Sequence, residues 1–546
     1  MQLRSLGDLR TSLGKLLYGS PIYGMSLAGR APGELALVPP DPWPGDAAQG
    51  GAILGGEFQF FDETVNAERV AWQAVGTSEA WRVALNGFEW LKDLRAVGGD
   101  AARRRARTLI DDWIEHHDNW HELAWRPDVL GRRLCAWLGQ HDFFCASADD
   151  AFRKRCFASL TRQAKHLSRA LPGGAAGEGR IVAIKALAVA GLCVPGHEGW
   201  RQQALKLLDG ELAGQILPDG GHPSRNPASL MAVLRHLVDL RGALLAGGRE
   251  VPPMLHAAIE RAAPMLRMLR HGDGGLALFN GAGEEQGAAI DMLLTQADAR
   301  ARPPTSAPYA GFERLTANRA LVLVDVGPSA AGEAAHAGTL SLEMSVGKER
   351  LIVNSGARPG AREPWSTAQR ATAAHSTLIV DDTNSTEITS RGRRAPTFIH
   401  CERQEADGAI WLDTAHDGYM ANFGLEHRRR LYLAADGDDL RGEDSLHRIG
   451  DAATPASQFV IRFHLHPAVT ASLARDGGAA LLRLPSGAGW RLRATGGTMS
   501  LGETVYLGAM DRMRRSEQIV VGGEIDANAA PAAEVRWALT RLENET

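Results

Sequence analysis

Hydrophobic positions recur with two different periods along the chain, and the period changes near residue 300. Before that point, apolar residues are spaced three or four apart, which predicts amphipathic helices. Segment 226–246 is the clearest case, because Asn226 is suited to cap a helix and Pro227 fits the first helical position. Its apolar face comprises Leu230, Val233, Leu234, Leu237 and Leu240.

The first half as a whole predicts an all-α domain. One segment, 180–194, is apolar on every side, whereas others are amphipathic, which indicates an inner and an outer layer of helices. The predicted helices are 78–97, 100–116, 128–139, 148–170, 180–194, 199–214, 226–246, 251–271 and 284–298, with no strands between them.

The second half predicts a sandwich of antiparallel sheets. After a polar, proline-rich linker near residue 300, short runs alternate between apolar and polar residues, as strands do. In 339–346 the alternation predicts a half-buried strand, with Ser341, Glu343 and Ser345 on the polar side. The predicted strands are 319–326, 339–346, 350–354, 376–381, 409–414, 427–434, 458–465, 479–484, 504–509, 518–522 and 535–541.

The amino-acid composition excludes some classes of protein function but does not identify one. The 546 residues are 44% hydrophobic and 23% charged, typical of a globular protein of more than one domain. A net charge of −4 argues against a strongly basic nucleic-acid binder. The five cysteines form no CxxC pair, so neither a disulfide scaffold nor a thiolate zinc site is expected.

The pattern of charges predicts no export signal and no transmembrane segment. Charged residues interrupt the N-terminal stretch every few positions, whereas a signal peptide needs an unbroken apolar core. The most apolar stretch, 181–194, contains Lys185 and is too short to span a bilayer. A cytoplasmic location is therefore expected, with the cell envelope or periplasm as the alternative.

Several motifs in register carry a family resemblance. The segments QILPDGGHPSRNP (215–227), AHAGTLSLEMSVGKERLIVNSG (335–356) and RATAAHSTLIVDD (370–382) resemble the heparinase II/III-like polysaccharide lyases. Two early helices, 78–91 and 125–138, are similar to the same family. The resemblance implies an N-terminal extension (1–50), an (α/α) toroid (51–305) and an antiparallel β-sandwich (306–546). It also implies an acidic polysaccharide or oligosaccharide as partner.

The family cleaves uronic-acid glycosides by β-elimination, which sets three chemical tasks. One group neutralises the sugar carboxylate, a base takes the C5 proton, and an acid protonates the leaving oxygen. The resemblance assigns these tasks to an Asn or His, a Tyr and a His of the sandwich.

The helical half departs from the family pattern at two of these positions. Ser229 stands where the family has its Tyr, and a serine hydroxyl is shorter and much less acidic than a phenol. Near the family's Asn, the polar residues are Glu178 and Arg180. Arg180 could pair with a substrate carboxylate, and Glu178 could act as a base only if its pKa were raised.

The sandwich half keeps more of the pattern. His375 matches the family's His in the R-x-T-x-x-H motif, and His336 matches a His before the first long strand. In some family members the latter joins an Asp and a His around a structural zinc. Asn354 replaces that Asp here, so the resemblance implies at most a weak zinc site at His336, Asn354 and His375, and no required cofactor.

Two candidate residues lie in the DGGH motif and one in the R-x-T motif. His222 could fix its loop through backbone hydrogen bonds or touch substrate. Arg225 could be a buried ion-pair partner or a clamp for an acidic group. Arg370 could position His375 or bind an acidic sugar.

Three aromatic residues complete the candidates. Tyr419, in AHDGYMANFG, could anchor a loop of the sandwich or substitute as acid or base. Trp120 and Trp125 are the tryptophans expected to line a sugar groove, although most tryptophans in the helical half are expected in the core. In the run 427–430 the alternation places charges on both faces of one strand, half of them solvated.

Three hypotheses follow in order of preference. The first is a lyase for uronic-acid glycans, with Arg180, His222 and Arg225 holding the acid group and His375, with Tyr419, handling protons. The second is a non-catalytic protein that binds an acidic glycan or serves in exopolysaccharide assembly. The third is a hydrolase or altered lyase that uses Glu178. The oligomeric state stays open.

Overall fold

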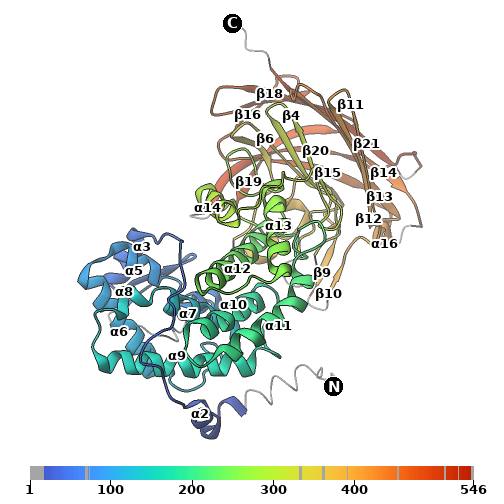
Figure 1. The fold of residues 1–546 in the computed structure, drawn as a ribbon. Helices are drawn as coiled ribbons and strands as arrows, with labels where there is room; N and C mark the ends of the chain where they lie inside the picture. The colour runs from blue at the N-terminus through green and yellow to red at the C-terminus, as the bar shows by residue number, and fades with distance from the viewer. Residues whose placement is uncertain are drawn as a thin grey trace. The chain divides into compact units, whose positions relative to one another are not determined.

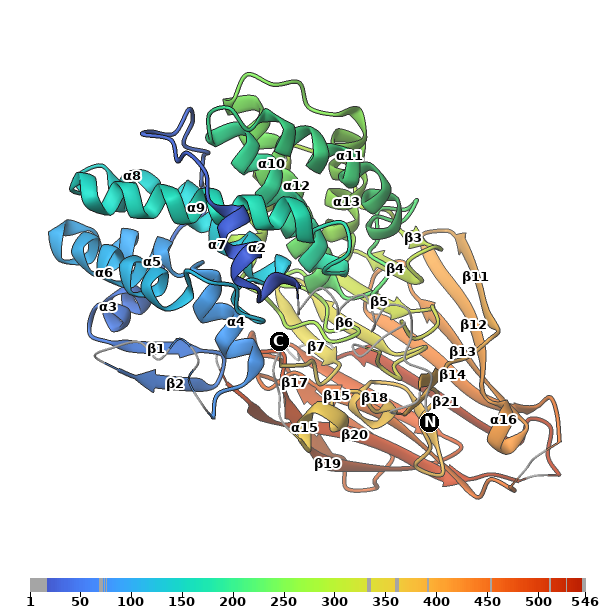
Figure 2. The same ribbon diagram turned by 90° about the horizontal axis from the view of Figure 1, so that it is seen from below.

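The computed structural model describes residues 17–542 except 68–71, 73, 75, 331–334, 359–362, 390–391, 452–453, 510–511 and 527. The chain divides into two compact units. The helical unit comprises the chain up to Gln215 together with Arg235–Ala257, and the sheet unit comprises Ile216–Leu234 together with the chain from Ala258 onward. Figures 1 and 2 show the elements of both.

Helices dominate the first part of the chain, and the predicted helices other than 78–97 are confirmed with small shifts of their ends. A short hairpin, β1 (Glu57–Phe60) and β2 (Glu63–Asn66), was not predicted, because its four-residue strands are too short to show a period. The helices are α2 (Pro21–Leu27), α3 (Ala47–Leu54), α4 (Glu79–Gly87), α5 (Leu91–Val97), α6 (Gly99–His117), α7 (Pro127–Gly139), α8 (His141–Cys145), α9 (Asp150–Ala170), α10 (Gly177–Cys193), α11 (Glu198–Gln215), α12 (Pro227–Ala246), α13 (Pro253–Met268) and α14 (Gly287–Ala297).

Helix α10 is the inner helix that its sequence predicts. Every residue from Ile181 to Gly191 is buried, and α7 and α11 pack against it. Glycines allow these close approaches. A methyl group on Gly131 of α7 would lie 3.0 Å from Ala183 Cα, and one on Gly191 would lie 2.4 Å from the Arg201 nitrogen.

The predicted helix 78–97 is two helices. It breaks at Phe88, which ends α4 in the left-handed conformation with φ of 59°. The Phe88 ring is fully buried and stacks on Trp72 and Trp90, so core packing holds the break. This tertiary contact is what the helical period could not reveal.

Two large antiparallel sheets form most of the sheet unit, as predicted. One sheet runs in the order β11-β12-β13-β14-β21-β18-β17-β16, and the other in the order β19-β20-β15-β7-β6-β5-β4-β3, with β8 beside β15. A small pair, β9 and β10, lies apart from them.

The strands are β3 (Ser306–Ala307), β4 (Phe312–Ala317), β5 (Ala320–Asp325), β6 (Leu342–Val346), β7 (Glu349–Val353), β8 (Leu378–Val380), β9 (Glu387–Thr389), β10 (Gly392–Arg394), β11 (Ile399–Ala406), β12 (Ala409–Tyr419), β13 (Leu425–Leu433), β14 (Asp439–Arg448), β15 (Gln458–Leu465), β16 (Thr470–Leu473), β17 (Ala479–Arg483), β18 (Gly489–Thr495), β19 (Thr498–Tyr506), β20 (Arg514–Glu524) and β21 (Ala533–Arg541). Short helices α15 (Trp365–Ala368), η1 (Thr372–Ala374) and α16 (Met420–Phe423) interrupt them.

The prediction that 339–346 is half-buried is wrong. All five residues of β6 are buried, including the polar side that alternation assigned to solvent. Glu343 is fully buried, and its carboxylate is satisfied there because His271 Nε2 lies 2.9 Å from its Oε2. The alternation within β6 cannot show that His271, which follows α13 far away in the chain, covers the polar side of this strand.

Strand β13 confirms the predicted alternation in the run 427–430. His427 and Arg429 are fully buried between the sheets, whereas Arg428 and Arg430 point outward. Asp444 receives hydrogen bonds from both buried side chains, at 2.8 Å from His427 Nε2 and 2.7 Å from Arg429 Nε. This buried ion pair fixes the inner side of the sandwich.

Part of the helical region that precedes the predicted domain boundary at residue 305 packs with the sheets. Segments 216–234 and 258–305 belong with the sheets. Buried arginines tie them there: Arg225 pairs with Asp325 of β5, and Arg350 of β7 lies 2.7 Å from Asp273. In the part of the chain that the structure describes, no helix is both long and apolar enough to cross a bilayer.

Candidate functional site

His375 lies at the end of the 3-10 turn η1, directly before β8, and it is buried. Two contacts hold its surroundings. Arg429 Nη1 donates to the carbonyl oxygen of the next residue, Ser376, at 3.0 Å. A methyl group on Gly338 would lie 2.6 Å from the His375 ring, so only glycine fits there. Arg429 therefore fixes the backbone next to His375, and Gly338 lies against its ring.

The hydrogen bonds of His375 define its protonation. Nδ1 lies 2.8 Å from the carbonyl oxygen of Ala371, so Nδ1 carries the proton and donates it. Burial lowers the pKa of His375, although the bond to Ala371 opposes this, so the ring is neutral near pH 7. The unprotonated nitrogen is then Nε2, the atom that could accept a proton.

His336 lies beside His375, as the motif likeness predicts. Their ring centroids are 5.5 Å apart with the planes at 90°. Burial lowers the pKa of His336, and the neighbouring His375 and Arg370 lower it further. Arg370 Nε donates to the carbonyl oxygen of Ala335 at 2.8 Å, so this arginine positions the loop that carries His336.

Asn354, the third residue of the zinc site that the resemblance implies, is held by a backbone hydrogen bond. Asn354 Oδ1 accepts the backbone N–H of Ser376 at 2.9 Å, which fixes the amide and leaves Nδ2 as its buried, unpaired atom. An amide NH₂ group has no lone pair to offer a cation. Among the described residues, no group of three His, Cys, Asp or Glu is arranged to hold a metal ion.

The DGGH motif residues are tied to their own unit. His222 Nδ1 lies 3.1 Å from the backbone nitrogen of Ser224, so the ring fixes its loop, as one of the two interpretations predicted. Arg225 is buried, pairs with Asp325 and donates to the carbonyl oxygens of Ala310, Gly311 and Pro328. Because these bonds occupy its guanidinium, Arg225 is a buried ion-pair partner and the prediction of an anion clamp is not supported.

The two proposed substitutes for the family's Tyr, Ser229 and Tyr419, lie in different surroundings. Ser229 lies half-buried in the first turn of α12, where its backbone nitrogen is 3.3 Å from the capping Asn226 Oδ1. Tyr419 is fully buried, its hydroxyl donates to the carbonyl oxygen of Leu378 at 2.8 Å, and burial raises its pKa. Tyr419 is thus an anchor of the sandwich, and its proposed role as acid or base is wrong because the phenol is enclosed.

In the helical unit, Glu178 is an ion-pair partner. Arg132 Nη2 lies 2.6 Å and His236 Nε2 lies 2.8 Å from its carboxylate. Burial would raise the pKa of Glu178, but the bond from His236 and the charge of Arg132 outweigh it and lower the pKa to about 2. The prediction that Glu178 could be a base with a raised pKa is therefore wrong.

Arg180 is also engaged. Its Nε lies 2.7 Å from Glu211, and its Nη1 donates to the carbonyl oxygen of Leu171 at 3.0 Å. The proposed role of Arg180 as a carboxylate ligand therefore competes with two existing partners.

The two tryptophans expected in a groove differ. Trp125 is buried and donates from Nε1 to the carbonyl oxygen of His117 at 3.0 Å, so the prediction that it lines a groove is wrong. Trp120 is half-buried next to Tyr18, with ring centroids 6.3 Å apart, and could still meet a ligand.

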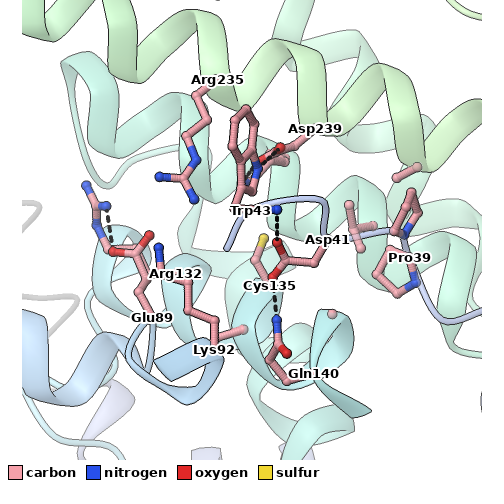
Figure 3. Close-up of a pocket in the computed structure, with 16 residues that line it drawn as sticks. Pro39, Asp41, Trp43, Glu89, Lys92, Arg132, Cys135, Gln140, Arg235 and Asp239 are labelled. Atoms are coloured by element: carbon pink, nitrogen blue, oxygen red, sulfur yellow. Dashed lines mark hydrogen bonds and ion pairs between the residues drawn. The ribbon is translucent and has the colours of Figure 1, made fainter. Parts of the chain in front are cut away.

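A polar pocket of the helical unit contains residues that sequence reasoning missed. Figure 3 shows Arg235 beside the ring of Trp43, and its guanidinium carbon lies 4.5 Å from the ring centroid, in the range of a cation–π contact. Asp239 accepts from Trp43 Nε1 at 2.7 Å and from Lys185 Nζ at 2.9 Å. The available signal was Lys185, the single charge in the apolar stretch 181–194. The remaining lining residues include Asp41, Glu89, Lys92, Arg132, Cys135 and Gln140.

Among the candidate residues of the sheet unit, His375 and His336 are two neutral imidazoles. His375 Nε2 is available as a proton acceptor, whereas the arginines and carboxyl groups assigned to the other tasks are occupied by internal bonds. The sequence located the segments that carry Arg180, Arg225 and Glu178. It could not show their ion-pair partners, because these lie far away in the chain.

Comparison with known families agrees with this arrangement of helices and sheets. Residues 51–297 match the model of the heparinase II/III N-terminus, and residues 299–538 match that of the heparinase II/III-like C-terminal domain. The chain therefore belongs to the heparinase II/III-like family.

A curated relative and several solved structures add to this. FtsZ-localized protein C from Caulobacter vibrioides is 34% identical over 96% of this chain and 93% of its own length. Among solved structures, a heparinase III has a TM-score of 0.75 at 13% identity, covering 99% of this chain and 93% of that one. The heparan sulfate lyase HepC from Pedobacter heparinus has a TM-score of 0.62 at 16% identity, covering 99% and 90%. At these identities the structures show a shared fold.

Proposed function

We propose that this chain is a non-catalytic member of its family that works by recognition or assembly. We also propose that it localizes with FtsZ, as the name of its curated relative states for that protein. One observation carries the proposal: no residue in the positions assigned to acid–base work, other than His375, is set up to transfer a proton. Ser229 replaces the phenol, Tyr419 is enclosed, and Glu178 is held as an anion.

The physical argument rests on the need for a second proton-transfer group. Elimination requires both removal of the C5 proton and protonation of the leaving oxygen. It also requires neutralisation of the substrate carboxylate. Arg180 and Arg225 are already paired with Glu211 and Asp325. The Arg225–Asp325 pair is buried, and breaking a buried pair costs about 3–5 kcal/mol, whereas the Arg180–Glu211 pair is partly exposed and costs less to break. A bound sugar would have to compensate that cost.

The test of the localization measures binding of the full-length protein to purified FtsZ from the same organism, together with the position of a fluorescent fusion in cells. Binding and co-localization support the proposal. A diffuse fusion and no binding to FtsZ would contradict this part of it.

The second candidate function is a lyase for uronic-acid polysaccharides, and the tautomer of His375 favours it. Because Nδ1 donates to Ala371, Nε2 presents a lone pair, as a base requires. The test incubates the protein with alginate, heparan sulfate, hyaluronan and chondroitin and follows the ultraviolet absorbance of the new C4=C5 double bond.

Two variants make this test decisive. His375→Ala should abolish any absorbance rise that the chain itself produces. Ser229→Tyr restores the phenol at the family's position and should raise the rate if the remaining site is competent. A rise in the unmodified protein that His375→Ala removes would establish the lyase and overturn the non-catalytic proposal, whereas no rise supports it.

A further inference from the structure

The outer surface of the eight-stranded sheet carries arginine and aromatic side chains in register across five strands. Trp411 of β12 pairs with Tyr432 of β13, and Tyr432 pairs with Arg441 of β14. Arg441 pairs with Ala538 of β21, which pairs with Arg493 of β18. Since neighbouring strands are about 4.8 Å apart, this row extends roughly 19 Å. Strands β12, β13, β14 and β21 lie side by side in Figure 1.

A second row flanks the first one. Arg430 of β13 pairs in register with Glu443 of β14, and Glu443 pairs with Arg536 of β21. The two rows line one groove, which holds about 1020 Å³ of empty space, part of it open to solvent. We call this surface, made of Trp411, Arg430, Tyr432, Arg441, Glu443, Arg493 and Arg536, the arginine–aromatic face.

The charged side chains of this face are largely exposed, and arginines outnumber glutamates in the groove. Four arginines and one glutamate line the groove. The side chains of Arg430, Arg441 and Arg536 are 50%, 65% and 67% exposed. Among the residues that the structure describes, Arg493 has no ion-pair partner within 4 Å. Arginines thus outnumber carboxylates within the groove, while Asp413, Asp439 and Glu534 pair with three of them at its margin.

The existing ion pairs leave donors free. Glu443 is shared between Arg430 at 3.1 Å and Arg536 at 3.2 Å, and Arg441 lies 2.7 Å from Asp439 at the margin. Arg430 also lies 3.3 Å from Asp413, and Arg536 lies 2.9 Å from Glu534. Each guanidinium has five N–H donors, so these carboxylates leave some donors unbound. Exposed ion pairs of this kind contribute little to stability, so an incoming anion can replace them at small cost.

The aromatic pair adds a surface for C–H groups. The rings of Trp411 and Tyr432 have centroids 5.0 Å apart, and Trp411 is 40% exposed. The face of an aromatic ring is its negative side and attracts the weakly positive hydrogens of sugar C–H bonds. Arg441 lies over Tyr432, with its guanidinium carbon 5.8 Å from the ring centroid.

From this geometry we infer that the arginine–aromatic face binds an extended acidic polysaccharide, with its carboxylates on the arginines and its ring faces on Trp411 and Tyr432. Guanidinium groups bind carboxylates through two parallel hydrogen bonds. A peptide partner would favour the edge of a sheet, where backbone groups are unpaired, over its face. The inference is independent of the function proposed for the His375 region.

The test measures the affinity of the full-length protein for alginate at low salt, with dextran as the neutral polysaccharide and poly-glutamate as the acidic polypeptide. Alginate should bind, dextran should not, and binding should weaken as salt rises. The double variant Arg441→Ala/Arg493→Ala should lose at least about tenfold in affinity, and Trp411→Ala should also weaken binding.

Matched variants on other surfaces of the same unit serve as controls. Arg475→Ala removes an exposed arginine outside the groove, and Trp365→Ala removes a tryptophan that is 38% exposed. Both should bind alginate as the unmodified protein does. Unchanged alginate affinity in the double variant, or binding of poly-glutamate without alginate, would overturn the inference. The ultraviolet assay and the FtsZ assay do not depend on this face, so their outcomes are separate.

Discussion

Arg429 and Arg430 are adjacent in β13, yet they belong to two regions of the molecule with opposite properties. Arg429 is fully buried and bound by Asp444, and it supports the segment that carries His375. Arg430 is half-exposed on the arginine–aromatic face and shares Glu443 with Arg536. The comparison teaches that charged side chains inside this sandwich stabilise the fold, whereas those that a partner could contact lie on its outer surface.

The largest expected effect comes from breaking the inner region. Asp444→Ala removes the anion from Arg429, His427 and Trp537 and leaves two cation-forming groups buried. We expect a loss of about 3–5 kcal/mol in the free energy of unfolding, measured by denaturant titration at pH 7. Glu443→Ala, on the outer face, is the control and should cost less than about 1 kcal/mol. Equal losses in both variants would erase the contrast between the regions.

The next effect concerns the ion pairs of the helical unit, and it depends on pH. The pKa of Glu178 falls from 4.5 to about 2 on folding, so its stabilising effect is complete above about pH 4.5 and disappears as the pH drops to about 2. Glu178→Gln should therefore lower stability by about 2–3 kcal/mol at pH 7 and by little near pH 2. If the stability of the unmodified protein and that of Glu178→Gln changed in parallel between pH 2 and pH 7, Glu178 would not be held as an anion.

A smaller effect tests the packing around His375. In Gly338→Ala, the added methyl group would meet the His375 ring at 2.6 Å and force it to move. We expect a loss of about 1–2 kcal/mol in thermal or chemical unfolding. Gly51→Ala in α3 is the control, because nothing lies within 4 Å of the added group and alanine favours a helix. A Gly338→Ala protein as stable as the control would mean that the ring is not confined.

The smallest expected effect is on the stability of the outer face. Arg441→Ala and Arg493→Ala should each change the free energy of unfolding by no more than about 0.5 kcal/mol, since surface substitutions of this kind seldom do more. Differential scanning calorimetry of both variants checks this. A loss above about 1 kcal/mol would place these arginines among the structural groups and weaken their assignment to a ligand.

Much of the architecture follows from the sequence, because period and motif order are local properties. The buried helix α10, the capping of α12 by Asn226 and the alternation in β13 were all predicted, and the likeness of the motif at 370–382 brought His336 and His375 together correctly. The shortest strands and the break at Phe88 were missed, since both depend on packing partners.

What the sequence by itself determined is therefore the family, the succession of helices and sheets, and the segments that supply the candidate site. Only the tertiary structure decided the state of each side chain, because charge and exposure depend on neighbours distant in the chain. Asp325 is 100 residues from Arg225 and His236 is 58 from Glu178, and these partners turned two candidate functional groups into structural ones. The register of five strands, in the same way, assembled the arginine–aromatic face from residues that no local motif connects.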